Sequence, residues 1–276
     1  PILIIFASSV AVTLYVSSDT TILGLLKNNY AVGIYSVSVK IYQMAEGILS
    51  ALLTVAIPRL AMLLGQRRLK EYNNVLSGVI GTLSILVLPA SVGLIMLSED
   101  VVLIIAGHKY LPSVNSLRII TWAIIFSIFA WIFSDCVLIP AKREGKLLRN
   151  TIITGITNVV LNFILIPFMS YDGTSLSTVI AEFMVMIMNG WACRDIIKPV
   201  ILSKNNFKNI ISSIIGCIGI VVVCLLCAWS WEALVLRMVF SVIFSVIVYG
   251  AILVLLRNEI AMSYIAKIKE IIKSKK

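Results

Sequence analysis

The sequence predicts an all-α polytopic membrane protein with eight transmembrane helices. Of its 276 residues, 60% are hydrophobic and only 13% are charged, and the mean hydropathy is +1.04. Ordinary soluble domains are close to half apolar and about a quarter charged. A soluble core could not absorb this much apolar surface, so lipid must be the solvent for most of the chain.

Eight stretches are long and apolar enough to cross the hydrocarbon core, which takes about 20 residues of helix. No extended soluble segment separates them. The chain begins Pro1-Ile2-Leu3 without an initiator Met, so we expect the sequence to start inside a longer protein and its first span to be truncated. The predicted spans are 1–26, 34–57, 75–97, 115–140, 150–168, 174–193, 209–228 and 234–256.

Basic residues are concentrated in alternate connections between the spans. Four connections hold eighteen of the 23 Lys and Arg residues, whereas those in between hold only Lys27 and Lys109. Cytoplasmic loops carry such an excess of cations. We therefore expect these connections and both chain ends to face the cytoplasm. With a net charge of +10, the chain is expected to contact anionic lipid rather than nucleic acid. The four connections are 58–74, 141–149, 194–209 and 257–276.

Two segments outside the spans are predicted to lie at the membrane surface. Residues 98–112 mix apolar and charged side chains. Residues 259–276 place isoleucines on one arc of a helix and most lysines on the remainder, which is typical of a basic amphipathic helix on the inner leaflet. For its last few residues a frayed, solvated tail is an equal alternative.

The residue inventory argues against an enzyme. The sequence has no phosphate-binding P-loop, no H-E-x-x-H motif and a single histidine, His108. This excludes a His-based triad and a His-rich metal site. Cys224 and Cys227 lie within an apolar span without a partner histidine, so they are expected to pack rather than bind metal or cycle redox state. We predict no cofactor and no metal site, with H⁺ or Na⁺ as a possible coupling ion.

Polar side chains inside apolar spans are the functional candidates, because a charge within the bilayer is costly and usually faces a wet cavity or a bundle interior. The span 34–57 places seven such positions within an arc of about 120°, with Ile41, Leu49 and Leu52 opposite. This polar stripe predicts one wall of a hydrated cavity. The alternative is a polar seam packed against another helix, with Lys40 and Glu46 paired. The polar stripe consists of Ser36, Lys40, Gln43, Glu46, Gly47, Ser50 and Thr54.

Four further residues carry weaker signals. Asn158 and Asn162 form a narrow stripe on the span 150–168; they could bind sugar hydroxyls, but helix packing is slightly favoured. Glu182 has no partner within its own span, so it is a candidate proton or cation site, or the partner of a cation on another helix. Asp19, near the outer end of the first span, could line the outer mouth of a pathway.

Several short motifs, in their order and spacing, resemble the C-terminal part of the polysaccharide and O-antigen flippases. This family belongs to the multidrug, oligosaccharidyl-lipid and polysaccharide exporter superfamily. A Pro-Arg turn after a span and a Gly-x-x-Tyr loop are among its features. The motifs are Asp19–Gly24, Val32–Ser36, Pro58-Arg59-Leu60, Gly107–Tyr110, Ile139–Asn150, Asn158–Pro167 and Asp172–Phe183.

The resemblance implies two helical lobes around a central cavity, of which the first is missing here. Residues 1–193 would be the second six-helix lobe, 194–256 two additional transmembrane helices, and 257–276 a cytoplasmic basic amphipathic tail. The family's substrates are undecaprenyl-diphosphate-linked oligosaccharide repeat units, flipped across the membrane for O-antigen, capsule or exopolysaccharide synthesis. The implied partners are this lipid-linked substrate, membrane lipids and the N-terminal lobe of the same protein.

The working hypothesis is alternating access through the cavity that the polar stripe borders. Lys40 would attract the diphosphate, and Gln43, Ser50 and Thr54 would bind sugar hydroxyls. Glu46 or Glu182 would couple the movement to protons or sodium. Two alternatives stay open: a drug or cation antiporter of the same superfamily, and a membrane polysaccharide polymerase or acyltransferase. Short outer connections with few acids and one histidine disfavour the second.

Overall fold

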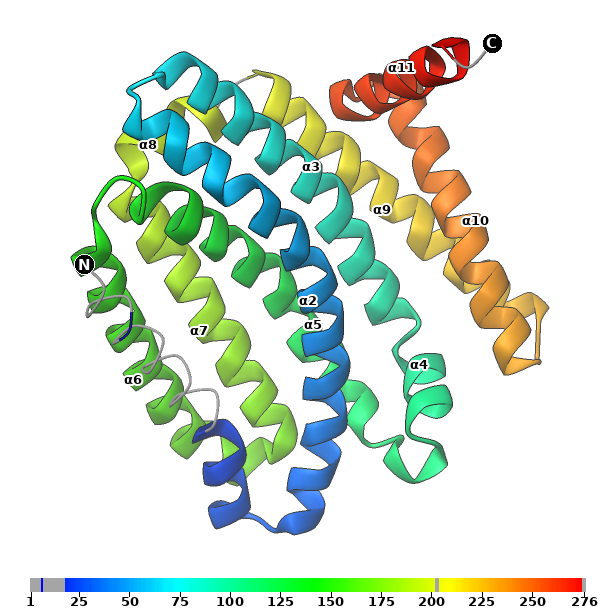
Figure 1. The fold of residues 1–276 in the computed structure, drawn as a ribbon. Helices are drawn as coiled ribbons and strands as arrows, with labels where there is room; N and C mark the ends of the chain where they lie inside the picture. Colours follow the sequence, from blue (N-terminus) through cyan, green and yellow to red (C-terminus); the bar gives the residue numbers. More distant parts are fainter. Residues whose placement is uncertain (1–5, 7–17, 202–203, 275–276) are drawn as a thin grey trace.

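Long helices run up and down through the molecule and form most of the part that the computed structural model describes, residues 6, 18–201 and 204–274 (Figure 1). Seven helices within these residues are long and apolar enough to cross a membrane. The first predicted span, 1–26, lies largely outside the described residues, of which 18–26 are helical. The seven long helices are α2 (Asn29–Gly65), α3 (Leu69–Met96), α5 with its π-helical end η2 (Ser113–Trp131, Ile132–Leu138), α6 (Glu144–Met169), α7 (Tyr171–Ala192), α9 (Lys204–Ser230) and α10 (Leu234–Leu255).

Large apolar side chains on the outside of these helices indicate that the helices are surrounded by lipid and not by water. Ile48, Val55, Phe168 and Trp229 are all more than 70% exposed, and exposed large apolar side chains recur on every long helix. Contiguous apolar surface of this extent is not stable in water. The chain is therefore a multi-pass, all-α membrane protein.

The α2 helix is longer than predicted, and it continues through a position where a turn was expected. A turn was expected at Pro58-Arg59, but α2 continues through Pro58 to Gly65. Proline removes one backbone hydrogen bond from a helix interior. The helix persists because Leu60 and Leu63, beyond the proline, are buried in the core. Pro89 and Pro167 likewise lie inside α3 and α6.

Three turns at one end of the bundle share an uncommon conformation. Arg67, Lys142 and Arg257 each follow a helix with a positive φ of 57°, 58° and 49°. After each, the next amide donates to a carbonyl five residues back, as in Arg68 N to Leu63 O at 3.0 Å. This helix ending usually uses glycine in the left-handed position. Here the position holds a cation near the negative end of a helix dipole.

The α5 helix is the centre of the larger of two hydrophobic cores. It packs against α2, α3 and α7, and its end widens into the π-helix η2. At such a widening, some backbone carbonyl groups lose their usual hydrogen-bond partner within the helix and need another. Tyr72 of α3, fully buried, donates its hydroxyl to the carbonyl oxygen of Cys136 at 2.8 Å.

The smaller core joins α9 and α10 to the bundle through α3. It contains Cys217, Ile220, Cys224, Tyr249 and Leu253, with side chains of α3 packed against it. Tyr249 donates a hydrogen bond to the carbonyl oxygen of Ile85 on α3 at 2.8 Å. The α9–α10 pair is therefore attached to one side of the main bundle (Figure 1).

The segments predicted to be interfacial are short or amphipathic helices. Residues 98–112 form α4 (Ser98–Ile105) and η1 (His108–Tyr110). The buried carboxylate of Asp100 on α4 is paired with Arg237 on α10. The predicted tail helix is α11 (Glu259–Ser274), whose Ile260 packs on Gly81 of α3.

All four cation-rich connections lie at the same end of the bundle, the upper end in Figure 1. They include the short helix α8 (Arg194–Ile201) and α11. The opposite end holds α4 and the α9–α10 turn. We call the first of these the cation-rich end.

Candidate functional site

The polar stripe lies on the outward side of α2. Lys40, Gln43 and Thr54 are exposed, whereas Ile41 and Leu49 on the other side are buried in the main core. Gly47 is also exposed, and Ser36, Glu46 and Ser50 are partly buried. The stripe therefore faces away from the described helices and is not a seam packed between them.

An apolar strip lies beside the polar stripe on the same helix. It consists of Met44, Ile48 and Val55, which are 64%, 74% and 81% exposed. Leu52, expected on the buried side, is also exposed, because it lies at the edge of this strip. The outward side of α2 thus presents two different surfaces: one suited to lipid, and one whose polar groups need water or a polar partner.

Lys40 and Glu46 do not pair with each other. Glu46 accepts a hydrogen bond from the hydroxyl of Tyr42 at 2.6 Å, one helical turn away. Lys40 and Gln43 make no side-chain hydrogen bond to any described residue. Ser50 and Thr54 bond only to the carbonyl oxygens of Gly47 and Ser50, at 3.0 and 3.5 Å. Lys40 and Gln43 are therefore available to a ligand.

Behind the stripe lies a group of acidic and hydroxyl side chains, the glutamate cluster, made up of Tyr42, Glu46, Ser127 and Glu182. Ser127 of α5 lies near Glu46, and its hydroxyl donates to the carbonyl oxygen of Ile124 at 3.2 Å. The buried Tyr42 hydroxyl interacts electrostatically with both Glu46 and Glu182. Glu182 itself is buried on α7. The cluster links the stripe on α2 to the interior of the bundle.

A second group, the Asp19 cluster, is more deeply buried. Asp19 is only 4% exposed and accepts hydrogen bonds from Asn162 Nδ2 at 2.6 Å, Thr178 Oγ1 at 2.9 Å and Tyr35 Oη at 3.3 Å. Asn162 also donates to Asn158 Oδ1 at 3.2 Å, and Ser177 Oγ donates to Asn162 Oδ1 at 2.7 Å. Asp19 therefore does not line an open mouth as expected; three helices, α2, α6 and α7, enclose it.

The Asp19 cluster has the chemistry of a proton or small-cation site. The carboxylate of Asp19 and the hydroxyl oxygens of Tyr35 and Thr178 are oxygen ligands of the kind that hard cations prefer, whereas Asn162 turns its Nδ2 toward Asp19. Among the described residues, the buried Asn158 Nδ2 and Thr174 Oγ1 beside it have no hydrogen-bond partner. Buried polar groups are normally satisfied, so unpaired ones at one place indicate a missing polar partner.

The two clusters are neighbours along the same helices. Thr178 and Glu182 are one turn apart on α7, and Tyr35 and Tyr42 are two turns apart on α2. Polar side chains therefore extend from the buried Asp19 through the glutamate cluster to the exposed stripe.

Several members of these clusters were not singled out as site residues from the sequence. Tyr35, Tyr42 and Ser127 look like ordinary residues of apolar helices, and only the structure brings them to Asp19 or Glu46. One signal was present: Tyr42 precedes Glu46, and Thr178 precedes Glu182, by four residues, the spacing that stacks side chains on one helix face.

Residues 3–115 match the family described as "Polysaccharide biosynthesis protein". A comparison with curated proteins found no significant match. The family match covers the motifs from Asp19 to Tyr110 and confirms the predicted resemblance at the level of this family.

The fold is similar to two solved transporter structures. One is the lipid II flippase MurJ in an inward closed conformation, with a TM-score of 0.71, 16% identity and 90% of this chain covered. The other is an outward-facing multidrug resistance MATE family transporter of the MOP superfamily, with a TM-score of 0.60, 14% identity and 96% covered. The chain spans 52% of the MurJ chain and 67% of the MATE chain. It therefore has a fold found in this transporter superfamily and corresponds to about half the length of MurJ.

Proposed function

We propose that this chain is the C-terminal part of an exporter that flips undecaprenyl-diphosphate-linked oligosaccharides across the bacterial inner membrane. In this proposal residues 1–193 form the second lobe, 194–256 two additional helices and 257–276 a cytoplasmic tail. The polysaccharide biosynthesis family match supports a role in polysaccharide synthesis, and the similarity to a lipid II flippase supports a lipid-linked substrate.

The observation that carries the proposal is the polar stripe of α2 on the outside of this half of the transporter. A diphosphate and its sugars are costly to move through hydrocarbon. A wall with an exposed, unpaired cation at Lys40 and hydrogen-bonding groups at Gln43, Ser50 and Thr54 lowers that cost. The apolar strip beside it lets the lipid tail stay in the bilayer.

The two acidic clusters supply a means of coupling. In an alternating-access cycle, a proton or sodium ion bound at Asp19 neutralises a carboxylate that is otherwise buried without a countercharge. The glutamate cluster lies between this site and the stripe, so binding at Asp19 can affect the side chains that face the substrate. This coupling role extends the earlier expectation for Glu46 and Glu182 to Asp19, Asn158 and Asn162.

The test is a complementation assay with the full-length protein. Lys40→Ala should reduce surface polysaccharide about tenfold, because it removes a charge-assisted contact. Lys70→Ala, an exposed lysine at the start of α3 away from the stripe, is the matched control and should export normally. Equal export by the two variants at equal protein level removes Lys40 from the mechanism.

The similarity to a MATE transporter favours one competing function, export of drugs or organic cations. An exposed lysine on the substrate wall repels such cations, which is why we rank this function second. Growth of cells expressing the full-length protein on toxic cations separates the two: protection that survives Lys40→Ala supports cation export and contradicts oligosaccharide flipping.

A further inference from the structure

A basic pocket with a volume of about 500 Å³ lies at the cation-rich end, away from the polar stripe. It is formed where the start of α6 meets the corner between α7 and α8. Its charged and aromatic lining consists of Arg143, Lys146, Arg149, Trp191, Arg194 and Asp195.

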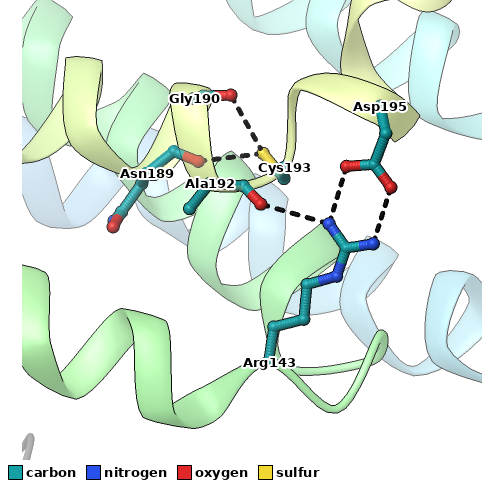
Figure 2. Close-up of polar contacts among 6 residues, drawn as sticks. All are labelled: Arg143, Asn189, Gly190, Ala192, Cys193 and Asp195. Atoms are coloured by element: carbon teal, nitrogen blue, oxygen red, sulfur yellow. Dashed lines mark hydrogen bonds and ion pairs between the residues drawn. The ribbon is translucent and has the colours of Figure 1, made fainter.

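One arginine holds the two walls of the basic pocket together. The guanidinium of Arg143 donates two hydrogen bonds to the carboxylate of Asp195, each 2.6 Å long, and a third to the carbonyl oxygen of Ala192 at 3.1 Å (Figure 2). Cys193 Sγ contacts the carbonyl oxygen of Asn189 at 3.0 Å in the same corner (Figure 2). Bidentate pairs of this kind fix orientation as well as charge.

The pocket carries an excess of positive charge. Asp195 is the one acid in its lining, and Arg143 already neutralises it. Lys146, Arg149 and Arg194 remain without a carboxylate partner among the lining residues. Arg194 lies 4.4 Å from the ring centroid of Trp191, which is 70% exposed. Three cations that have no carboxylate partner in this lining, beside an exposed tryptophan, are suited to the headgroup region of a membrane.

An apolar groove of about 580 Å³ continues from the basic pocket. It runs between α5, α7 and α9, with α3 and α8 at its sides, and no residue of α2 lines it. Trp191 and Arg194 belong to both the groove and the basic pocket. The remaining lining is almost entirely apolar, including Leu88, Phe126, Phe129, Ile187 and Ile214.

A cationic pocket and an apolar groove that share two residues have the layout of a site for an amphiphile. We propose that they hold one anionic phospholipid from the leaflet at the cation-rich end. Its phosphate contacts Lys146, Arg149 and Arg194, and its acyl chains lie in the groove. Because α2 does not contribute, this lipid is separate from the translocation pathway. It joins α9 to α5 and α7 and so helps to hold the α9–α10 pair on the bundle.

The experiment uses full-length protein in a neutral detergent, with 1-palmitoyl-2-oleoyl-phosphatidylglycerol as the probe. Binding is followed by the shift in melting temperature during titration and by native mass spectrometry of retained lipid. Lys146→Gln with Arg194→Gln should weaken binding about 30-fold, since each cation near a membrane surface adds affinity for anionic lipid. Lys142→Gln with Lys198→Gln removes the same charge from the same two segments outside the pocket and should leave affinity unchanged.

A second pair of variants tests the groove. Ile214→Trp fills it and should weaken phosphatidylglycerol binding, whereas Ile218→Trp, exposed on the same helix outside the groove, should not. Equal binding by the charge variant and its control overturns the proposal. So does displacement of the lipid by inorganic phosphate at similar concentration, which indicates an anion pocket alone. Displacement by farnesyl diphosphate at lower concentration overturns it in favour of an isoprenoid diphosphate.

Discussion

Asp19 is a carboxylate that three helices remove from water and surround with neutral donors. Thr178, Asn162 and Tyr35 satisfy its oxygens with hydrogen bonds, but none of them supplies a positive charge. A buried carboxylate without a countercharge is unstable when ionised. Asp19 is therefore suited to binding and releasing a proton or a cation during transport.

Asp19→Asn should separate this role from a structural one. The amide keeps the shape: its one oxygen can still accept from Asn162 Nδ2, and its NH₂ group can donate to the hydroxyl oxygen of Thr178 on the other side. The melting temperature should therefore stay the same or rise. Export in the complementation assay should fall at least tenfold, about 1.4 kcal/mol in the coupling step.

The matched control for this variant is Asp172→Asn. Asp172 lies at the start of α7 and accepts from Asn115 at 2.7 Å, with no contact to Asp19. It should export normally. Full export by Asp19→Asn excludes a coupling role for Asp19.

At this scale the sequence could point to the residues but not to their arrangement. Lys40, Glu46 and Glu182 stand out because charges are rare in apolar spans. Two of the three partners of Asp19, Asn162 and Thr178, lie 143 and 159 residues further along the chain, so only the packing of α2, α6 and α7 reveals them. This is why Asp19 was expected at an open mouth and is found buried.

Among the elements, hydropathy located each long helix but not its ends. The span 34–57 was expected, whereas α2 runs from Asn29 to Gly65, beyond the apolar core at both ends. Hydropathy marks where lipid surrounds a helix, while caps and turns decide where the helix stops. Asn28 caps α2 by accepting from the Ala31 amide at 2.9 Å, and the left-handed Arg67 follows its last turn.

The left-handed turns allow a prediction about stability. Lys142 has a φ of 58°, a conformation that costs a non-glycine residue about 1 kcal/mol. Lys142→Gly should therefore raise the free energy of unfolding by up to about 1 kcal/mol. Lys208→Gly, exposed within α9, should lower it by about the same amount. Thermal unfolding in detergent measures both; a loss of stability in both variants contradicts the turn assignment.

For the whole molecule, the Arg143–Asp195 pair joins α6 to the α7–α8 corner outside the apolar spans. The hydrogen bonds from Arg143 lower the pKa of Asp195 from 3.8 to about 2. A lowered pKa means that the pair stabilises the fold above about pH 4 and loses this effect as the pH falls through about 2. Because both side chains are partly exposed, the contribution should be below about 1 kcal/mol.

Asp195→Asn should therefore melt at a slightly lower temperature than the wild type at about pH 6, and at the same temperature near pH 2. The measurement is a series of thermal unfolding curves of the full-length protein in detergent. A difference that stays constant over this pH range contradicts the assignment of the pair.

The sequence was least informative about the positions of the helices relative to each other. Alternation of cations between connections predicted a common end for four of them, and Figure 1 shows them together. The attachment of the α9–α10 pair depends on Tyr249, which bonds to α3, and on Arg237, which pairs with Asp100 of α4. These residues carry no pattern that pairs them in advance.

The central claim is that the polar stripe of α2 faces water within the membrane while the adjacent apolar strip faces lipid. It is tested most directly by labelling single cysteines in the full-length protein in membranes with a membrane-impermeant thiol reagent. The five cysteines of this chain are buried, which limits their contribution to the background. We predict rapid labelling of Gln43→Cys and Thr54→Cys and none of Ile48→Cys or Val55→Cys. Equal labelling of the two pairs, or none of either, would contradict the account.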